Sequence, residues 1–161
     1  MYTYSVRTLE NAEREFYIHL DSYFVSILDE DTSRVPQFSR KIPESHWHII
    51  RLNSESRNVD KIWKQIDALI EWKKTIPEGS HIVVHCSMGM VRSPALAIAL
   101  LISDGLTPLE AFDSLKNQKP LNNCSDCDPE PDFIILETID CYFELSGNLC
   151  LSTFDYDFSR R

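Results

Sequence analysis

Four short runs of β-branched and aromatic residues occur along the chain, separated by segments with a different spacing of apolar positions. The runs cover residues 2–6, 23–28, 46–52 and 82–85. Such runs, bounded by polar or turn-forming residues, are typical of β-strands. The last run is apolar without alternation, which indicates a strand buried on both faces of a parallel sheet.

The segment of residues 58–75 has the three- and four-residue spacing of an amphipathic helix. Its apolar positions fall on one stripe and its charged residues on the other side, and Pro77 and Gly79 follow it. We therefore predict a helix with a buried stripe made of Val59, Ile62, Trp63, Ile66, Leu69 and Ile70.

The segment that starts at Ser93 is apolar on all sides, which predicts a helix through the middle of the fold. Asp104 and Gly105 are expected to end it. Further helices are predicted over residues 8–15, 107–116 and 133–145, the second of them opened by a capping box of Thr107 and Glu110. The segments over residues 29–42 and 117–131 are polar and contain proline, so they are predicted to be loops.

This alternation of strands and helices predicts a single α/β domain with a central, mainly parallel sheet flanked by helices. We place the domain at residues 1–150 and a C-terminal tail at 151–161. Ligands of such sheets bind beyond the carboxyl ends of the strands, which directs attention to the segment after the fourth strand.

The net charge of −9, from 16 basic and 25 acidic residues, argues against binding to nucleic acid or to an anionic membrane. No apolar run approaches the roughly 20 residues that cross a bilayer, and the N-terminus does not resemble a signal peptide, so we expect a cytoplasmic protein. Its five cysteines are scattered and odd in number, which favours free thiols. Cys124 and Cys127 have no second ligand pair at metal-binding spacing, so no metal is expected.

The strand-to-helix junction reads HCSMGMVRSP from His85 to Pro94. A tight curl at this point directs several backbone N–H groups inward at the positive end of a helix, which suits a tetrahedral dianion. Gly89 permits the curl, and Arg92 offers a planar fork for two phosphate oxygens. The same field is expected to lower the pKa of Cys86 below the free value of about 8.5, which makes its thiolate a nucleophile. The phosphate-binding residues would be Ser87, Met88, Gly89, Met90, Val91 and Arg92.

Cys86, five intervening residues, Arg92 and Ser93 resemble the signature loop of the protein tyrosine phosphatase superfamily, in its compact dual-specificity-like branch. The resemblance extends over roughly residues 2–145. It implies that Cys86 attacks the phosphate to form a cysteinyl-phosphate, that Arg92 and the loop amides bind it, and that water hydrolyses it without a metal or other cofactor. His85 would support the loop, and the Ser93 hydroxyl would stabilise the departing thiolate.

The aspartic general acid of this superfamily normally lies on a loop about 30 residues before the cysteine. That position falls on Asn53 or Ser54 here, and Glu55 is the nearest carboxyl group that could replace it. Asp60 and Asp128 are the alternatives: the first opens a predicted helix, where acidic residues are often structural, and the second precedes a proline on a late loop. Catalysis without an acid also stays open.

The leading hypothesis is a phosphotyrosine or dual-specificity protein phosphatase that acts on a phosphorylated protein or another phosphate ester. One alternative is a phosphate-binding pseudophosphatase that lacks the acid. Another is a phosphatase of non-protein substrates, such as phosphoinositides or RNA 5′ ends. The neutral side chains of Ser87, Met88, Met90 and Val91 favour a peptide or a small aryl phosphate. A protective redox role of Cys124 or Cys127 stays open.

Overall fold

The computed structural model describes residues 1–87, 91–117 and 130–150 of the 161-residue chain. Its strands lie where the sequence predicts them. They are β1 (Thr3–Arg7), β2 (Tyr23–Leu28), β3 (Trp47–Arg51) and β4 (His81–His85).

The five predicted helices are also present, with some shifted ends. They are α1 (Leu9–Ile18), α2 (Val59–Lys73), α3 (Arg92–Ser103), α4 (Pro108–Asn117) and α5 (Phe133–Tyr142). The first extends beyond its predicted end at residue 15. The last ends earlier than predicted, because Glu144 and Ser146 have positive φ angles that no helix accommodates. The loop predicted before residue 42 contains a short 3₁₀ turn, Gln37–Arg40, and a second turn, Glu44–His46, precedes β3.

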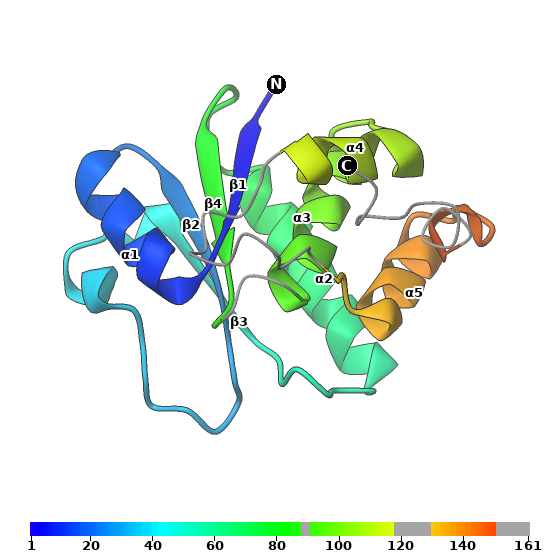
Figure 1. The fold of residues 1–161 in the computed structure, drawn as a ribbon, viewed down its shortest axis with the longest axis horizontal. Coiled ribbons are helices and arrows are strands. Elements are labelled where there is room, and N and C mark those ends of the chain that lie inside the picture. Colours follow the sequence, from blue (N-terminus) through cyan, green and yellow to red (C-terminus); the bar gives the residue numbers. More distant parts are fainter. Residues whose placement is uncertain (88–90, 118–129, 151–161) are drawn as a thin grey trace.

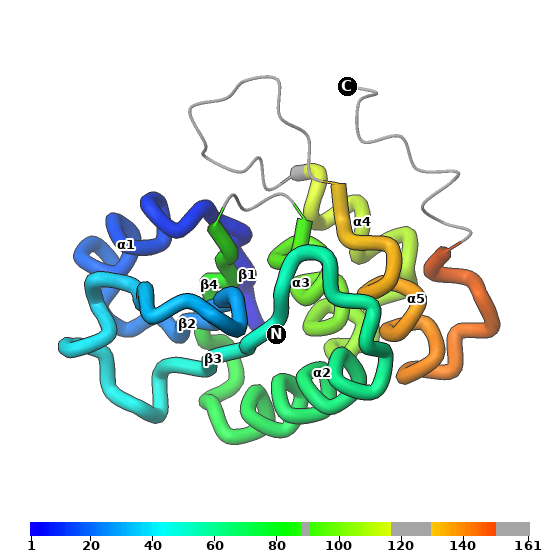
Figure 2. Tube along the Cα trace, turned by 90° about the horizontal axis from the view of Figure 1, so that it is seen from below, coloured from blue at the N-terminus to red at the C-terminus, as the bar shows by residue number. Residues whose placement is uncertain are grey.

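The strands form one parallel sheet in the order β1-β4-β2-β3. Helix α1 covers one face and helices α2 to α5 cover the other (Figures 1 and 2). This arrangement confirms the predicted α/β class, and it places the carboxyl ends of all four strands at the same edge of the sheet.

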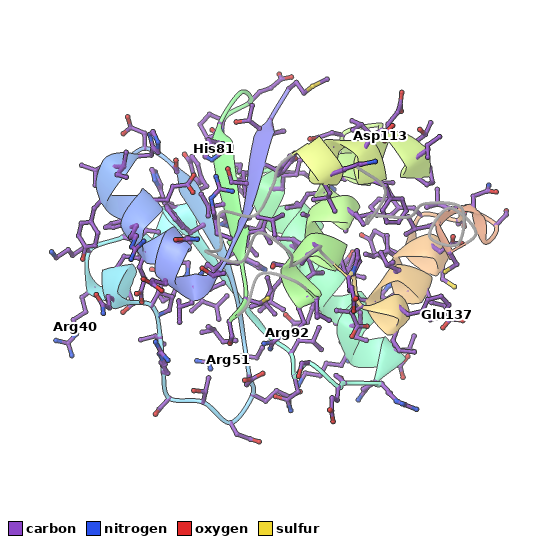
Figure 3. All side chains as sticks on the ribbon, in the orientation of Figure 1. Arg40, Arg51, His81, Arg92, Asp113 and Glu137 are labelled. Atoms are coloured by element: carbon purple, nitrogen blue, oxygen red, sulfur yellow. The ribbon has the colours of Figure 1, made fainter. Side chains whose placement is uncertain are left out.

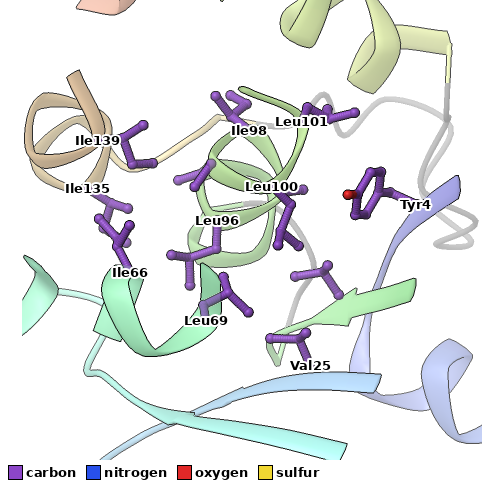
Figure 4. Packing of buried hydrophobic residues seen from close by; sticks show 14 of the residues in the cluster. Tyr4, Val25, Ile66, Leu69, Leu96, Ile98, Leu100, Leu101, Ile135 and Ile139 are labelled. Carbon is purple, nitrogen blue, oxygen red and sulfur yellow. The ribbon is translucent and has the colours of Figure 1, made fainter. Parts of the chain in front are cut away.

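Alternating strand residues build two cores, one on each face of the sheet. Val25, Ile27, Ile82 and Val84 belong to the larger cluster under α2 to α5. Their neighbours Phe24 and Val83 belong to the smaller cluster on the other face. It also contains Ala12 and Phe16 of α1, with Phe38 and Ile42. Figure 4 shows the larger cluster around α3, with side chains from α2, α5, β1 and β2 converging on it. The unbroken apolar run of β4 is thus explained by burial on both sides.

Helix α3 is buried on all sides, as its lack of a polar face predicts. It ends at Asp104, and Gly105 takes a φ of 95°, which favours glycine. The predicted capping box of α4 is also present, because Thr107 and Glu110 bond to each other's backbone N–H. In the described ranges no helix combines the length and the apolar character that a membrane span requires.

The buried stripe of α2 is narrower than predicted at its start and includes a charge at its end. Val59 and Trp63 are 49% and 40% exposed, whereas Ile62, between them in sequence, is fully buried, so the first two lie at the margin of the stripe. Lys73, by contrast, is buried, and its ammonium group pairs with Asp104 and donates to Ser103 Oγ at 2.6 Å. Tyr4 donates to the other oxygen of Asp104 at 2.5 Å. A buried polar cluster therefore joins β1, α2 and the end of α3.

Candidate active site

The candidate site lies at the carboxyl edge of the sheet. Cys86 follows the last residue of β4 and Arg92 opens α3, so the predicted loop spans the strand-to-helix junction. Figure 3 shows Arg92 and Arg51 at this end of the molecule and His81, the first residue of β4, at the other. Met88, Gly89 and Met90 lie outside the described residues.

The structure brings Cys86 and Ser93 together, as the signature predicts. The two atoms Cys86 Sγ and Ser93 Oγ are 3.2 Å apart, within hydrogen-bonding distance. Cys86 is 3% exposed and Ser93 is fully buried. A hydroxyl group held beside sulfur can stabilise a thiolate, which is the role expected of Ser93.

Backbone hydrogen bonds hold both described ends of the loop. The N–H of Leu9, at the start of α1, donates to Ser87 O at 3.3 Å, and the N–H of Asp132 donates to Val91 O at 3.0 Å. Asp132 also caps α5, since its Oδ1 accepts from the N–H of Ile135 at 3.0 Å. The loop is therefore attached to the first and last described helices of the fold.

His85 supports the site from the α1 face of the sheet. Trp47 Nε1 can only donate, and it does so to Ser26 Oγ at 2.8 Å. Ser26 Oγ lies 2.6 Å from His85 Nε2, so the simplest network has the Ser26 hydroxyl donating to a neutral ring. Burial lowers the pKa of His85 to about 4, and the neighbouring Cys86 backbone opposes this shift only in part. The ring next to Cys86 is thus uncharged at neutral pH.

The lowered pKa of His85 predicts a pH-dependent stability. In the unfolded chain the His85 ring binds a proton near pH 6.5, and in the folded protein only near pH 4. The contribution of the neutral ring to the free energy of unfolding is therefore complete above pH 6.5 and is lost as the pH falls to about 4. The loss is on the order of 3 kcal/mol. Urea unfolding at pH 7 and pH 4.5 measures the free energy of unfolding at each pH. Its decrease between the two should be smaller for His85→Gln than for the unmodified protein. The exposed His19→Gln is the control, and an unchanged decrease in His85→Gln would contradict the assignment.

A single nitrogen of the Arg92 guanidinium donates hydrogen bonds to two acceptors. Its Nη1 donates to Asp29 Oδ1 at 2.7 Å and to Leu52 O at 2.8 Å. Its Nε and Nη2 bond to no residue within the ranges that the structure describes. Arg92 itself is 5% exposed, so the guanidinium is buried with one edge occupied and the other available.

Asp29 is the residue of this site that the sequence analysis did not identify. It lies directly after β2, the strand that pairs with β4, so both ends reach the same edge of the sheet. The position of an acidic residue after a buried strand was a usable signal. What remained hidden was the order of the strands, which makes β2 rather than β1 or β3 the neighbour of β4 on this side.

Two of the three carboxyl groups predicted as general acids, those of Glu55 and Asp60, lie in the described part of the chain. Glu55 lies on an exposed turn and Asp60 in the exposed first turn of α2, and within the described ranges neither makes a hydrogen bond or ion pair. Asn53, one of the positions that the acid usually takes, instead accepts the N–H of Glu30 through Oδ1 at 2.9 Å. Asp128 lies outside the described residues, as do Cys124 and Cys127.

These residues together suit a tetrahedral anion. A buried thiol lies next to a hydroxyl group at the end of β4, and the available edge of a guanidinium starts the helix that follows. Such a guanidinium edge matches two oxygens of a phosphate group.

No protein-family model matches the sequence, and no curated protein does. Solved structures nevertheless share its fold. Human DUSP28 is 16% identical over 89% of this chain and 93% of its own, with a TM-score of 0.59. The PTP-2 phosphatase of Cydia pomonella is 15% identical over 83% of this chain and 78% of its own, with a TM-score of 0.62. PTPMT1, solved in complex with PI(5)P, is 16% identical over 89% and 91%, with a TM-score of 0.55. The chain therefore has the compact dual-specificity phosphatase fold.

Proposed function

We propose that this protein is a cysteine-dependent phosphatase that hydrolyses phosphomonoesters, with phosphotyrosine or dual-specificity protein substrates as the first candidates. The observation that carries the proposal is the placement of Cys86, Ser93 and the available edge of Arg92 at one strand-to-helix junction. The fold shared with DUSP28 and the PTP-2 phosphatase supports it.

The proposed reaction has two steps. In the first, the Cys86 thiolate attacks phosphorus and the S–P bond forms while the P–O bond to the leaving group breaks. The leaving oxygen takes a proton from a general acid, and Arg92 with the loop amides binds the phosphoryl oxygens. In the second step, water attacks phosphorus and gives a proton to the carboxylate that the general acid became, the S–P bond breaks, and Ser93 stabilises the returning thiolate. The products are the alcohol or phenol and inorganic phosphate.

Glu55 is the proposed general acid, with Asp128 and Asp60 as alternatives. Its exposed turn follows β3 at the carboxyl edge of the sheet, on the same side as Cys86. The Glu55→Gln variant is therefore expected to lose about 10²-fold in kcat on an alkyl phosphate, whose leaving group needs a proton. It should also lose the basic limb of its pH–rate profile.

Aryl phosphates provide the internal control for this variant, since a good leaving group needs little protonation. Asp128→Asn and Asp60→Asn test the alternatives in the same assay. An unchanged profile in all three variants would favour catalysis without an acid.

The substrate class is tested with the purified protein on a phosphotyrosine peptide, a phosphoserine peptide, an aryl phosphate and a phosphoinositide. Hydrolysis of the phosphotyrosine peptide and the aryl phosphate is expected, because the loop side chains Ser87 and Val91 carry no positive charge for a polyanionic head group. The complex of PTPMT1 with PI(5)P makes the phosphoinositide the second candidate. Phosphate binding without hydrolysis of any of the four would identify a binding module instead.

A further inference from the structure

We infer that Asp29 is a positioning residue, which fixes the guanidinium of Arg92 so that one edge faces the phosphate group. The inference rests on the proposed function and extends it to a residue outside the signature loop. Asp29 reaches Arg92 with a single bond of 2.7 Å from Oδ1 to Nη1, across 63 positions of sequence.

The choice of nitrogen decides what the guanidinium can still bind. Asp29 and the carbonyl oxygen of Leu52 both accept from Nη1, at 2.7 and 2.8 Å. The remaining edge, Nε with Nη2, has two parallel N–H groups and therefore the geometry that binds two phosphate oxygens at once. Rotation of the guanidinium would break both bonds, so Asp29 and Leu52 select which edge is presented.

The segment that carries Asp29 is itself held in place. Arg51 donates from Nη1 to the carbonyl oxygens of Asp29 and Thr32, at 3.1 and 2.8 Å. Lys61 Nζ, from α2, pairs with Glu30 at 2.5 Å. These contacts attach the loop after β2 to β3 and α2 and make Asp29 a fixed reference for Arg92, as a preorganised site requires.

Charge supports the same assignment. The Arg92 side chain is 6% exposed, and Asp29 is its ion-pair partner in the described part of the chain. A buried cation without a partner is costly, so Asp29 balances Arg92 before the phosphate arrives. The Asp29 side chain is 47% exposed, so it holds Arg92 from the rim of the site, where water reaches it.

The test compares Asp29→Asn with Asp31→Asn, a matched change of charge two positions away on an exposed side chain without a described ion pair. Inorganic phosphate binding is measured by calorimetry, and kcat/KM is measured on a good and a poor leaving group. For Asp29→Asn we expect phosphate affinity and both kcat/KM values to fall by roughly 10- to 100-fold. Asp31→Asn should stay within about twofold of the unmodified protein, and Asp29→Ala should show a larger loss than Asp29→Asn.

Three results from the variants would overturn the inference and leave the proposed function standing. Phosphate affinity that is unchanged or higher in Asp29→Asn and Asp29→Ala would identify Asp29 as inert or as a competitor of phosphate for Arg92. A loss confined to the poor leaving group would identify a proton donor instead. An undiminished effect of Asp29→Asn in an Arg92→Lys background would show that Asp29 does not act through Arg92. Failure of the unmodified protein to bind phosphate would reject the proposed function itself, and the inference with it. Thermal unfolding of every variant separates these outcomes from loss of the fold.

Discussion

The Cys86→Ser variant is expected to lose aryl phosphatase activity by roughly 10⁶-fold, the scale on which a hydrolase responds to removal of its nucleophile. A serine hydroxyl is not ionised at neutral pH, and no described side chain at Cys86 is a charged base that could activate it. His85, the adjacent candidate, bonds through Nε2 to Ser26 and is directed to the α1 face of the sheet. The substitution thus removes the proposed nucleophile without supplying another.

Phosphate binding should survive in Cys86→Ser, because Arg92 and its partners Asp29 and Leu52 are unchanged. Calorimetry with inorganic phosphate measures binding, and release of phenol from an aryl phosphate measures turnover. Cys141→Ser, an exposed cysteine of α5, is the control and should retain full activity. Residual activity of Cys86→Ser near that of the unmodified protein would refute the cysteinyl-phosphate mechanism.

The largest effect on stability is expected from Lys73→Met, which should lower the free energy of unfolding by about 3–5 kcal/mol. The substitution leaves the Asp104 carboxylate, 9% exposed, without its cation. Tyr4 still donates to Asp104, and its pKa is raised by burial and by that hydrogen bond, so it stays protonated but supplies no charge.

Lys74→Met is the matched control, because Lys74 and Glu71 form an ion pair with both side chains about three-fifths exposed. Such a surface pair contributes less than about 1 kcal/mol. Urea unfolding of both variants measures the difference, and equal losses would show that the Lys73 cluster is not a buried ion pair in solution. Adding Asp104→Asn to Lys73→Met should recover part of the loss, because the orphaned charge is removed.

Most of the fold follows from patterns within single segments. The four strands and helices α1 to α5 lie close to where local sequence patterns predict them, because burial on a sheet or against a helix demands a fixed spacing of apolar side chains. Lys73 was missed because its burial depends on an acceptor at the end of another helix, Asp104, 31 positions away. The exposure of Val59 and Trp63 likewise depends on which flank of α2 the rest of the domain covers, and the spacing along α2 does not contain that information.

In the candidate site, too, relations within one segment could be predicted and contacts between distant segments could not. Cys86, Arg92 and Ser93 lie within eight positions of sequence, and a short motif at a strand end sufficed to relate them. The contact of Arg92 with Asp29 depends on the order β1-β4-β2-β3, which puts the ends of β2 and β4 side by side. Sheet order is set by packing across the whole domain. For that reason the sequence alone did not indicate that an acidic residue after β2 belongs to the site.

The pairing of β1 with β4 has a consequence for synthesis of the protein on the ribosome. Thr3 aligns with His81, so β1 cannot pair with β4 until β4 has left the exit tunnel. At about 5–20 residues per second, the roughly 80 intervening residues take on the order of 4–16 s. During that time β2 and β3 can pair, since Phe24 and Trp47 are closer in sequence. The nascent chain must therefore keep β1 unpaired for seconds, and Cys86, at the end of β4, reaches its place in the sheet only after that interval.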